Sequence, residues 1–449
     1  MGVESGVFTA RRAALKALEA FRRNKAWPDL VLGGLIDRYG LQARDAALAS
    51  RIVNGVIQNM SLCDYYITCF SSISINKIEP RVLDVLRMSI YQLVFLDKIP
   101  PSAAVNESVV LVRSISNPRA AGFVNAVLRN VAQSVKTGSL PEIAGDPGFR
   151  LSIKYSHPEW LVSEICENLG IDSAEAFLLA NNAANLPTTV QVNTLRSDAD
   201  NVLRLLDSND TVPVRHEWLD DCVELSGARG ITRLEAFRRG FIYVQDAAAR
   251  LAVAAAAPKP GDFVIDGCAA PGGKSFAAAI MMRNSGRILA LDINEKKLHG
   301  VSAGANRLGI GIIDTLASDA SICNDELKDK ADVVIADVPC SGFGVIRKKP
   351  EIRYKTQQEI SSLPGLQRML LSALSRYVRP GGTLMYSTCT VLRRENEEVV
   401  EPFIRENPQF STEGFKLPGA GLAGNGMITL WPHIHGTDGF FICRLRRNG

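Results

Sequence analysis

The chain has 449 residues, of which 46% are hydrophobic and 22% charged, and its formal net charge is +4. This composition is typical of a soluble globular protein with room for two or three domains. No apolar run approaches the roughly 18 residues of a membrane span, and nine cysteines without a CxxC pair argue against a disulfide framework or a zinc ribbon. We therefore expect reduced thiols, a cytoplasmic location and no membrane partner.

Residues 1–140 are predicted to form an all-helical domain. Apolar residues recur at helical spacing from residue 6 to about 135, which predicts five to seven helices. Residues 1–150 carry 18 lysines and arginines against 12 acids, an excess that suggests a polyanion partner but is also found on ordinary solvated surfaces. The segment 101–131 contains AVNESV and FVNAVLRN and resembles the NusB family of small helical RNA-binding proteins. The resemblance implies RNA contact for this domain.

A small α/β domain is predicted at 150–238, after a linker at 136–150 that contains glycine, proline and serine. A helix is expected near residues 157–169. The expected strands are 188–193, 214–225 and 241–244. No catalytic constellation is visible in this domain, so we interpret it as a substrate-positioning or packing module.

Residues 239–449 alternate between strand and helix patterns, which predicts an α/β domain with a mostly parallel, doubly wound, Rossmann-like sheet. The expected strands are 263–267, 287–292, 312–317, 332–337 and 382–387. The expected helices are 275–283, 295–308, 357–378 and 394–406. The last of these would place acids in its first turn, where their negative charge interacts favourably with the helix dipole.

The stretch 266–275, DGCAAPGGKS, joins an expected strand to an expected helix, where such sheets hold nucleotide-like cofactors. A phosphate-binding P-loop would need glycine at position 268, which is Cys268, and the fingerprint GxGxxG is absent. Asp292 ends the next strand, about 20 residues past the glycines, and can accept hydrogen bonds from a ribose. A ribose-bearing ligand without a phosphate loop indicates S-adenosylmethionine; the alternative is an ordinary glycine-rich turn. Asp319 follows the next strand and either accepts from an adenine amino group or caps a helix.

Two cysteines follow later strands of the same sheet, Cys340 after ADVP and Cys389 after YST, and Asp337 lies three residues before the first. A thiolate beside a methyl donor suits methylation of a pyrimidine carbon, since carbon 5 of cytosine is a poor nucleophile until a thiolate adds at carbon 6. An acid near the ring nitrogen N3 would stabilise the adduct. The residues alone do not decide which cysteine attacks.

Three blocks, DGCAAPGGKS, ADVPCSGFGVIRKKPEIRY and LMYSTCT, resemble the signature blocks of the RNA 5-methylcytosine methyltransferases, the RsmB/NOP family. The resemblance covers nearly the full chain and implies a class I methyltransferase domain at 239–449 that uses S-adenosylmethionine. It also implies that Cys389 is the nucleophile and that Cys340 assists breakdown of the covalent intermediate, with Asp337 as the third catalytic residue. The cofactor contacts it implies are Cys268, Ala269, Ala270, Pro271, Gly272, Gly273, Lys274, Asp292, Asp319 and Asp337.

The loop 347–355 follows Cys340 and carries five basic residues against one acid. Beside a nucleophile that acts on RNA, we expect phosphate contact rather than a merely solvated loop. The expected RNA-binding residues are Arg347, Lys348, Lys349 and Arg353. His433 and His435 have no third ligand in the pattern, so no metal site is predicted.

With a NusB-like domain in front, the architecture is similar to that of family members acting on 16S ribosomal RNA. We therefore predict a monomeric enzyme that methylates carbon 5 of a cytosine in 16S ribosomal RNA or a small-subunit precursor. One alternative is the same chemistry on another RNA, such as transfer RNA. The other is a NusB-like RNA-binding assembly factor with a vestigial methyltransferase domain.

Overall fold

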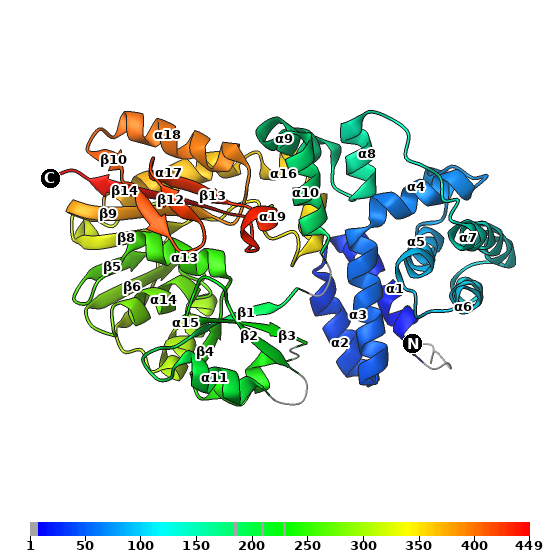
Figure 1. Cartoon of the computed structure of the whole chain (residues 1–449), viewed down its shortest axis with the longest axis horizontal. Helices are drawn as coiled ribbons and strands as arrows, with labels where there is room; N and C mark the ends of the chain where they lie inside the picture. The colour runs from blue at the N-terminus through cyan, green and yellow to red at the C-terminus, as the bar shows by residue number, and fades with distance from the viewer. Residues whose placement is uncertain (1–7, 184–185, 208–210, 228–229) are drawn as a thin grey trace. The chain divides into compact units, whose positions relative to one another are not determined.

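The computed structural model describes residues 8–183, 186–207, 211–227 and 230–449. The chain divides into two compact units, Met1–Asn182 and Ala183–Gly449 (Figure 1). In the described residues, no helix is long and apolar enough to cross a membrane.

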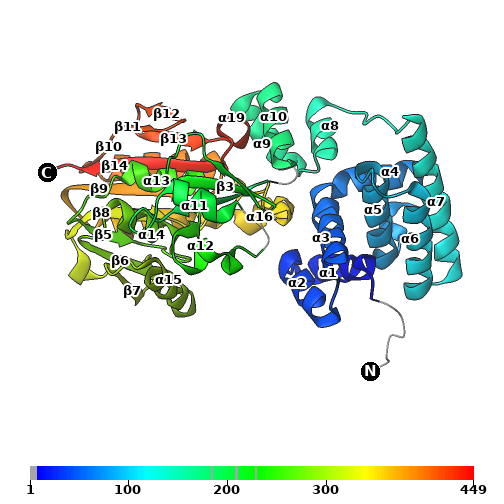
Figure 2. The same ribbon diagram turned by 60° about the horizontal axis from the view of Figure 1, so that its bottom comes forward.

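The first unit is entirely helical where it is described (Figure 2). Its helices are α1 (Ala10–Asn24), α2 (Pro28–Tyr39), α3 (Ala43–Gln58), α4 (Met60–Phe70), α5 (Pro80–Phe95), α6 (Pro101–Ile115), α7 (Pro118–Thr137), α8 (Pro147–Lys154), α9 (Glu159–Leu169) and α10 (Ile171–Asn181). Helix α5 is the most deeply buried and packs against α1, α3, α4, α6 and α7. Proline at the start of several helices favours these starting points, because it lacks only an N–H that has no partner in the first turn. The all-helical prediction for this part of the chain is confirmed.

Helices α8 to α10 group with the first unit rather than with the strands that follow. The predicted linker over 136–150 comprises the end of α7, the connecting loop and the first residues of α8. The domain limits at 140, 150 and 238 stay predictions.

The second unit begins with a small antiparallel sheet in the order β2-β3-β1-β4. Its elements are β1 (Thr188–Val192), α11 (Ala199–Leu206), β2 (Val212–Arg215), β3 (Cys222–Ser226), α12 (Glu235–Arg238) and β4 (Ile242–Val244). The single strand predicted over 214–225 is wrong: β2 and β3 pair as a hairpin. The backbone N–H of His216 donates to the Cys222 carbonyl at 3.0 Å, and that of Cys222 donates to the Leu219 carbonyl at 3.1 Å.

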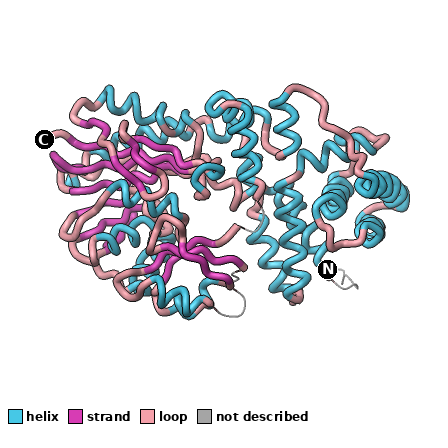
Figure 3. Tube along the Cα trace, in the orientation of Figure 1, coloured by secondary structure: helices cyan, strands magenta, loops and turns pink. Residues whose placement is uncertain are grey.

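A large sheet forms the centre of the second unit (Figure 3). Strands β5 (Phe263–Asp266), β6 (Arg287–Asp292), β7 (Ile313–Ala317), β8 (Ala331–Asp337) and β9 (Val378–Thr388) are parallel, in the order β9-β8-β5-β6-β7. The antiparallel β14 (Phe440–Arg447) lies beside β9 and pairs with β10 (Phe410–Thr412) and β13 (Met427–Leu430). The chain runs one way from β5 to β7 and the other way from β8 to β9, so a topological switch point lies between β5 and β8.

Alternate strand residues pack against helices on opposite faces of this sheet. Helices α13 (Ala247–Ala256), α14 (Gly273–Met281) and α15 (Glu295–Leu308) share one hydrophobic core with residues such as Val264 and Ile335. Helices α17 (Leu363–Ser375) and α18 (Glu397–Glu406) share the other core with Ile265, Val334 and their neighbours. The predicted doubly wound, mostly parallel fold is confirmed.

The structure corrects several element limits in this unit. The helix predicted over 357–378 is two helices, α16 (Gln357–Ile360) and α17, since Pro364 stands in the first turn of α17, and β9 already begins at Val378. The helix predicted over 394–406 begins at Glu397. Helix α13 and the strands after α18, including the hairpin β11 (Phe415–Leu417) and β12 (Gly421–Ala423), were not predicted.

Candidate active site

The candidate residues lie where parallel strands end, at the carboxyl edge of the large sheet. The turn 267–273 follows β5, Asp292 ends β6, Asp319 follows β7, and Asp337 ends β8. Cys389 follows β9 directly. Because the strands are parallel neighbours, their carboxyl ends meet along one edge, which is where ligands bind in open α/β sheets.

The turn after β5 is tied to the end of β6. One oxygen of Asp292, Oδ2, accepts the Ala270 N–H at 3.2 Å, and Oδ1 accepts the Asn294 N–H at 2.9 Å. Gly272 has a φ of +104°, and a Cβ there would lie 2.6 Å from the Phe276 ring. The turn therefore needs glycine at 272, both for its backbone conformation and for the aromatic ring packed beneath it.

Four carboxylates surround Cys268. Burial raises the pKa of this thiol, and the negative charges of Asp266, Asp337, Asp292 and Asp319 raise it further. Asp319 itself is exposed, and its Oδ1 accepts the Ser321 N–H at 2.9 Å and hydroxyl at 2.7 Å, which lowers its pKa. These contacts are those of a turn-capping aspartate, and contact with a cofactor stays a prediction. The acids that act on Cys268 favour a cationic ligand over one that carries phosphates.

Asp337 at the carboxyl end of β8 and Lys274 at the start of α14 form an ion pair. Asp337 Oδ2 lies 2.6 Å from Lys274 Nζ, and Oδ1 accepts the Ser387 hydroxyl at 2.7 Å. Burial lowers the pKa of Lys274, but the charge and hydrogen bond of Asp337 outweigh it, so the net pKa is raised. Lys274 is therefore cationic at neutral pH and holds Asp337 in place.

The two cysteines predicted from the sequence face each other. Cys340 Sγ and Cys389 Sγ lie 3.1 Å apart, and both side chains are partly exposed. Their hydrogen bond raises the pKa of Cys340 and lowers that of Cys389. Asp337 opposes and Lys274 supports the ionisation of Cys389, so both charges lie close enough to act on it. The two shifts are opposite in direction, so Cys389 is the more readily ionised of the two thiols.

Asp266, the first residue of the glycine-rich stretch, was not predicted as a site residue. It is completely buried, its Oδ2 accepts the Ser275 hydroxyl at 2.7 Å, and its Oδ1 has no partner among the described residues. Burial raises its pKa to about 6. Its position at the carboxyl end of a buried strand was the signal that could have identified it.

We expect Asp266→Asn to remove a pH dependence of stability. A carboxyl whose pKa is higher in the folded state than in the unfolded chain stabilises the fold most below the unfolded pKa of about 3.9. That contribution, on the order of 3 kcal/mol for a rise to about 6, is lost as pH increases from about 4 through 6. Urea unfolding of both proteins between pH 4.5 and 7.5 tests this. The difference between variant and wild type should increase in favour of the variant with pH, and a constant difference would contradict the assignment.

The basic loop after Cys340 does not present all of its charges to solvent. Arg347 Nε lies 2.8 Å from Asp438 Oδ1, and Lys348 forms ion pairs with Asp246 and Asp438. Arg353 is fully buried. The prediction that Arg353 contacts RNA is therefore corrected, because a buried guanidinium cannot reach a phosphate. Arg347 and Lys348 bind Asp246 and Asp438 and so fix the loop, while Lys348 and Lys349 both remain exposed.

The turn between Cys340 and this loop packs against Cys389 and against Gly439, just before β14. Gly344 N donates to the Cys389 carbonyl at 3.0 Å, and Gly439 N donates to the Gly344 carbonyl at 2.8 Å. A Cβ on Gly344 would lie 1.8 Å from the Gly439 oxygen and 2.8 Å from the Cys389 oxygen. Only glycine permits this approach of three backbone segments beside the cysteines.

Gly344→Ala should therefore lower the free energy of unfolding by at least about 1–3 kcal/mol, the usual cost of overpacking, because backbone segments must separate to admit the methyl group. Denaturant unfolding measures the change. Gly365→Ala is the matched control, since nothing lies within 4 Å of its added Cβ in α17. Equal stability of the two variants would show that the loop is not packed in this way.

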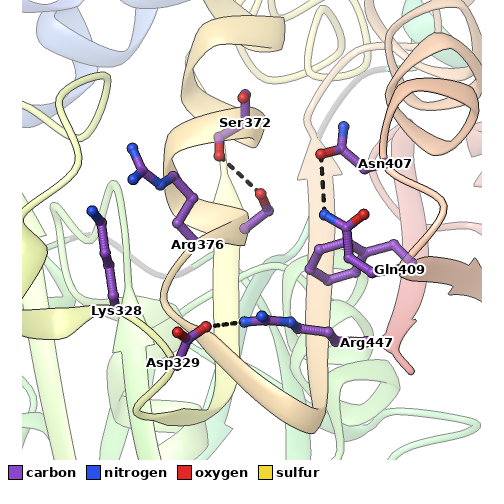
Figure 4. A pocket seen from close by; sticks show the side chains of 9 residues that line it. Lys328, Asp329, Ser372, Arg376, Asn407, Gln409 and Arg447 are labelled. Atoms are coloured by element: carbon purple, nitrogen blue, oxygen red, sulfur yellow. Dashed lines mark hydrogen bonds and ion pairs between the residues drawn. The ribbon is translucent and has the colours of Figure 1, made fainter. Parts of the chain in front are cut away.

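A pocket of about 410 Å³ lies elsewhere on the second unit, beside the amino ends of β8 and β9 (Figure 4). It is lined by Lys328, Asp329, Ser372, Ser375, Arg376, Asn407, Gln409, Phe410 and Arg447. It shares no residue with the candidate site.

Among the described residues, no group of three or more His, Cys, Asp or Glu side chains could hold a metal ion. His435, one of the two histidines considered as ligands, instead accepts the Trp431 N–H at its Nδ1 at 2.8 Å.

Comparisons with known proteins agree on all three parts of the chain. The model of the family described as 16S rRNA methyltransferase RsmB/F matches residues 253–446, the NusB family model matches 9–133, and a RsmF/B-like ferredoxin-like domain matches 157–232. The "Probable ribosomal RNA small subunit methyltransferase B" of Bacillus subtilis is 35% identical over 98% of this chain and 99% of its own. The protein of the same description from Synechocystis is 30% identical over 98% and 100%. The crystal structure of PH0851 matches with a TM-score of 0.80 and 27% identity over 98% of both chains.

Proposed function

Because the chain belongs to the RsmB/F family of 16S rRNA methyltransferases, whose methyl donor is S-adenosylmethionine, we propose that it methylates carbon 5 of a cytosine in small-subunit ribosomal RNA. The observation that carries this proposal is the pair of cysteines with sulfurs 3.1 Å apart, beside the Asp337–Lys274 ion pair. A methyltransferase acting on a ribose oxygen or an amino group has no need of two such thiols. A pyrimidine carbon does, because it must be activated by a nucleophile.

The residues at the sheet edge fit the proposed cofactor. When bound, S-adenosylmethionine supplies an electrophilic methyl group on a positively charged sulfur. We assign its contacts to the turn from Cys268 to Lys274 and to Asp292, Asp319 and Asp337. The acids around Cys268 suit a cationic ligand, and carboxylates at strand ends suit ribose hydroxyls.

Covalent addition begins the proposed reaction. The Cys389 thiolate forms a bond to carbon 6, the electron pair of the carbon 5–carbon 6 double bond moves into the ring, and N3 takes up the proton of the Cys340 thiol. Asp337 and Lys274 stabilise the charge that develops on the ring. Carbon 5 becomes nucleophilic and takes the methyl group.

Elimination of Cys389 from the methylated base completes the proposed reaction. The Cys340 thiolate removes the proton of carbon 5, the carbon 5–carbon 6 double bond re-forms, and the bond from carbon 6 to Cys389 breaks with its electron pair on sulfur. The N3 proton then leaves to solvent, so each turnover releases one proton. The Cys340 thiol and Cys389 thiolate of the free protein are restored, in agreement with the opposite directions of their pKa shifts.

Bisulfite sequencing of total RNA tests the proposal. In a bacterial host that lacks its own family member, wild-type protein should restore a protected cytosine in small-subunit ribosomal RNA, and Cys389→Ser should not. Protection in transfer RNA alone would move the substrate to another RNA. An unmodified transcriptome with folded, cofactor-binding protein would favour an assembly factor with a vestigial methyltransferase domain.

A further inference from the structure

Two adjacent buried residues, Glu395 and Asn396, each contact the loop that carries one of the two cysteines. They stand just before α18, and their side chains are 0% and 1% exposed. Neither side chain forms a hydrogen bond to a sulfur atom of the described residues. Their hydrogen bonds go to the residues on either side of each cysteine, directly or through Gln367.

Glu395 holds the loop of Cys340. Its Oε2 accepts the backbone N–H of Ser341 at 2.8 Å and the Nε2–H of Gln367 at 2.9 Å. The same Gln367 nitrogen donates to the Pro339 carbonyl at 3.0 Å. The residues immediately before and after Cys340 are thus both tied to one carboxylate oxygen.

Asn396 holds the loop of Cys389 in the same manner. Its Oδ1 accepts the Thr388 hydroxyl at 2.6 Å, and its Nδ2 donates to the Thr390 carbonyl at 3.1 Å. The residues on both sides of Cys389 are therefore bound to one amide side chain.

The backbone that carries these two side chains is itself anchored. The Tyr386 hydroxyl donates to the Glu395 carbonyl at 2.6 Å, and the Asn396 carbonyl accepts the N–H groups of Val399 and Val400 at 3.0 and 3.1 Å. Glu395 and Asn396 are consecutive, so the two loops they bind cannot move independently.

We propose that Glu395 and Asn396 are positioning residues for the reaction, Glu395 placing Cys340 for breakdown of the adduct and Asn396 placing Cys389 for attack. This inference rests on the proposed function, in which the two cysteines perform different steps. Loss of either contact should therefore impair a different step, whereas a merely structural role would impair both alike.

A conservative variant separates position from charge. Both N–H groups bound by Glu395 go to Oε2, and Oε1 has no partner among the described residues. Glu395→Gln can place its amide oxygen at the Oε2 position and keep both contacts, while Glu395→Ala loses them. For Asn396, Thr388→Val removes the hydroxyl that donates to Oδ1 and keeps the shape of the threonine.

The first measurement is the ratio of RNA-linked protein to methylated product. Glu395→Ala should lower turnover by about 10- to 100-fold, the cost of a displacement near 1 Å, and should accumulate the covalent adduct. Asn396→Ala and Thr388→Val should lower turnover and adduct together, and their double variant should be no worse than the more affected single variant. Glu395→Gln should restore product formation. Glu398→Ala, on the exposed side of α18, is the matched control and should behave as wild type.

The second measurement needs neither RNA nor cofactor. A diazene oxidant takes two hydrogens from Cys340 and Cys389, is reduced to its hydrazine, and leaves a disulfide between them. Its rate reports the spacing of the sulfurs. We expect at least about a tenfold slower closure in Glu395→Ala and Asn396→Ala than in wild type or Glu395→Gln.

Unchanged closure rates with wild-type product ratios would overturn the inference, and so would equal losses of adduct and product in both alanine variants. If wild type itself modified no RNA while closure slowed as expected, the placement of the two cysteines by Glu395 and Asn396 would stand, and the proposed function would fall together with the reaction steps assigned to them. Thr388→Val removes a contact of Asn396 but preserves side-chain volume, so the role of Asn396 can be tested even if Asn396→Ala does not fold.

Discussion

Replacing Cys389 with alanine should lower methyl transfer by more than about 10³-fold and leave cofactor affinity within about threefold of wild type. The reason lies in where the thiol acts. Cys389 follows β9 and lies 3.1 Å from Cys340, whereas the assigned cofactor residues lie at the carboxyl ends of β5, β6, β7 and β8. The alanine variant keeps the acids and glycines of the cofactor site and loses only the group that adds to carbon 6.

Methyl incorporation into undermethylated small-subunit RNA measures the activity, and calorimetric titration with S-adenosylmethionine measures the affinity. Cys443→Ala is a suitable control because this buried thiol lies on β14, in the core on one face of the sheet. It should lose some stability and retain activity. Normal turnover of Cys389→Ala would refute the nucleophilic role, and joint loss of activity and binding would indicate a structural one.

The fold could be predicted well where the pattern of residues reflects burial. Strands β5, β6 and β8 are short, mostly buried apolar runs, so each stands out against its polar surroundings. The strands after α18 do not stand out from their surroundings in this way. Strands β10, β11 and β12 have three residues each and lie between glycines and prolines, a pattern that is equally typical of loops.

Some residues of the candidate site could likewise be placed from the sequence, and others could not. Residues on signature blocks at strand ends, such as Cys340 and Cys389, could be placed from the sequence because parallel strands bring their carboxyl ends together. The pattern of charged residues led to wrong predictions at two other positions. Arg353 was predicted to meet RNA but is buried, and Glu395 was assigned to the first turn of a helix but lies inside the protein and binds the Ser341 N–H. Local sequence does not distinguish a solvated charge from one whose partner is 54 residues away.

The remaining large effect is expected for Cys340→Ala. In the proposed reaction this residue gives its proton to N3 and later takes the proton of carbon 5. Solvent can supply the N3 proton in its absence, so the bond between Cys389 and the base still forms, but it breaks slowly because no base is placed at carbon 5. Turnover should fall by about 10²- to 10⁴-fold, the usual contribution of a positioned acid or base, while protein linked to RNA accumulates. The hydrogen bond between the sulfurs lowers the pKa of Cys389 and raises that of Cys340, so the two thiols are suited to different steps.

A denaturing gel of the variant purified from cells measures the adduct, and nuclease treatment should return the band to the position of free protein. The double variant Cys340→Ala/Cys389→Ala is the control, because it lacks the nucleophile and should show no shifted band. Sequencing of the linked RNA would name the target cytosine. Absence of an adduct, with wild type active on the same RNA, would mean that another group removes the carbon-5 proton. In that case the raised pKa of Cys340 would reflect only its hydrogen bond to Cys389 and its burial.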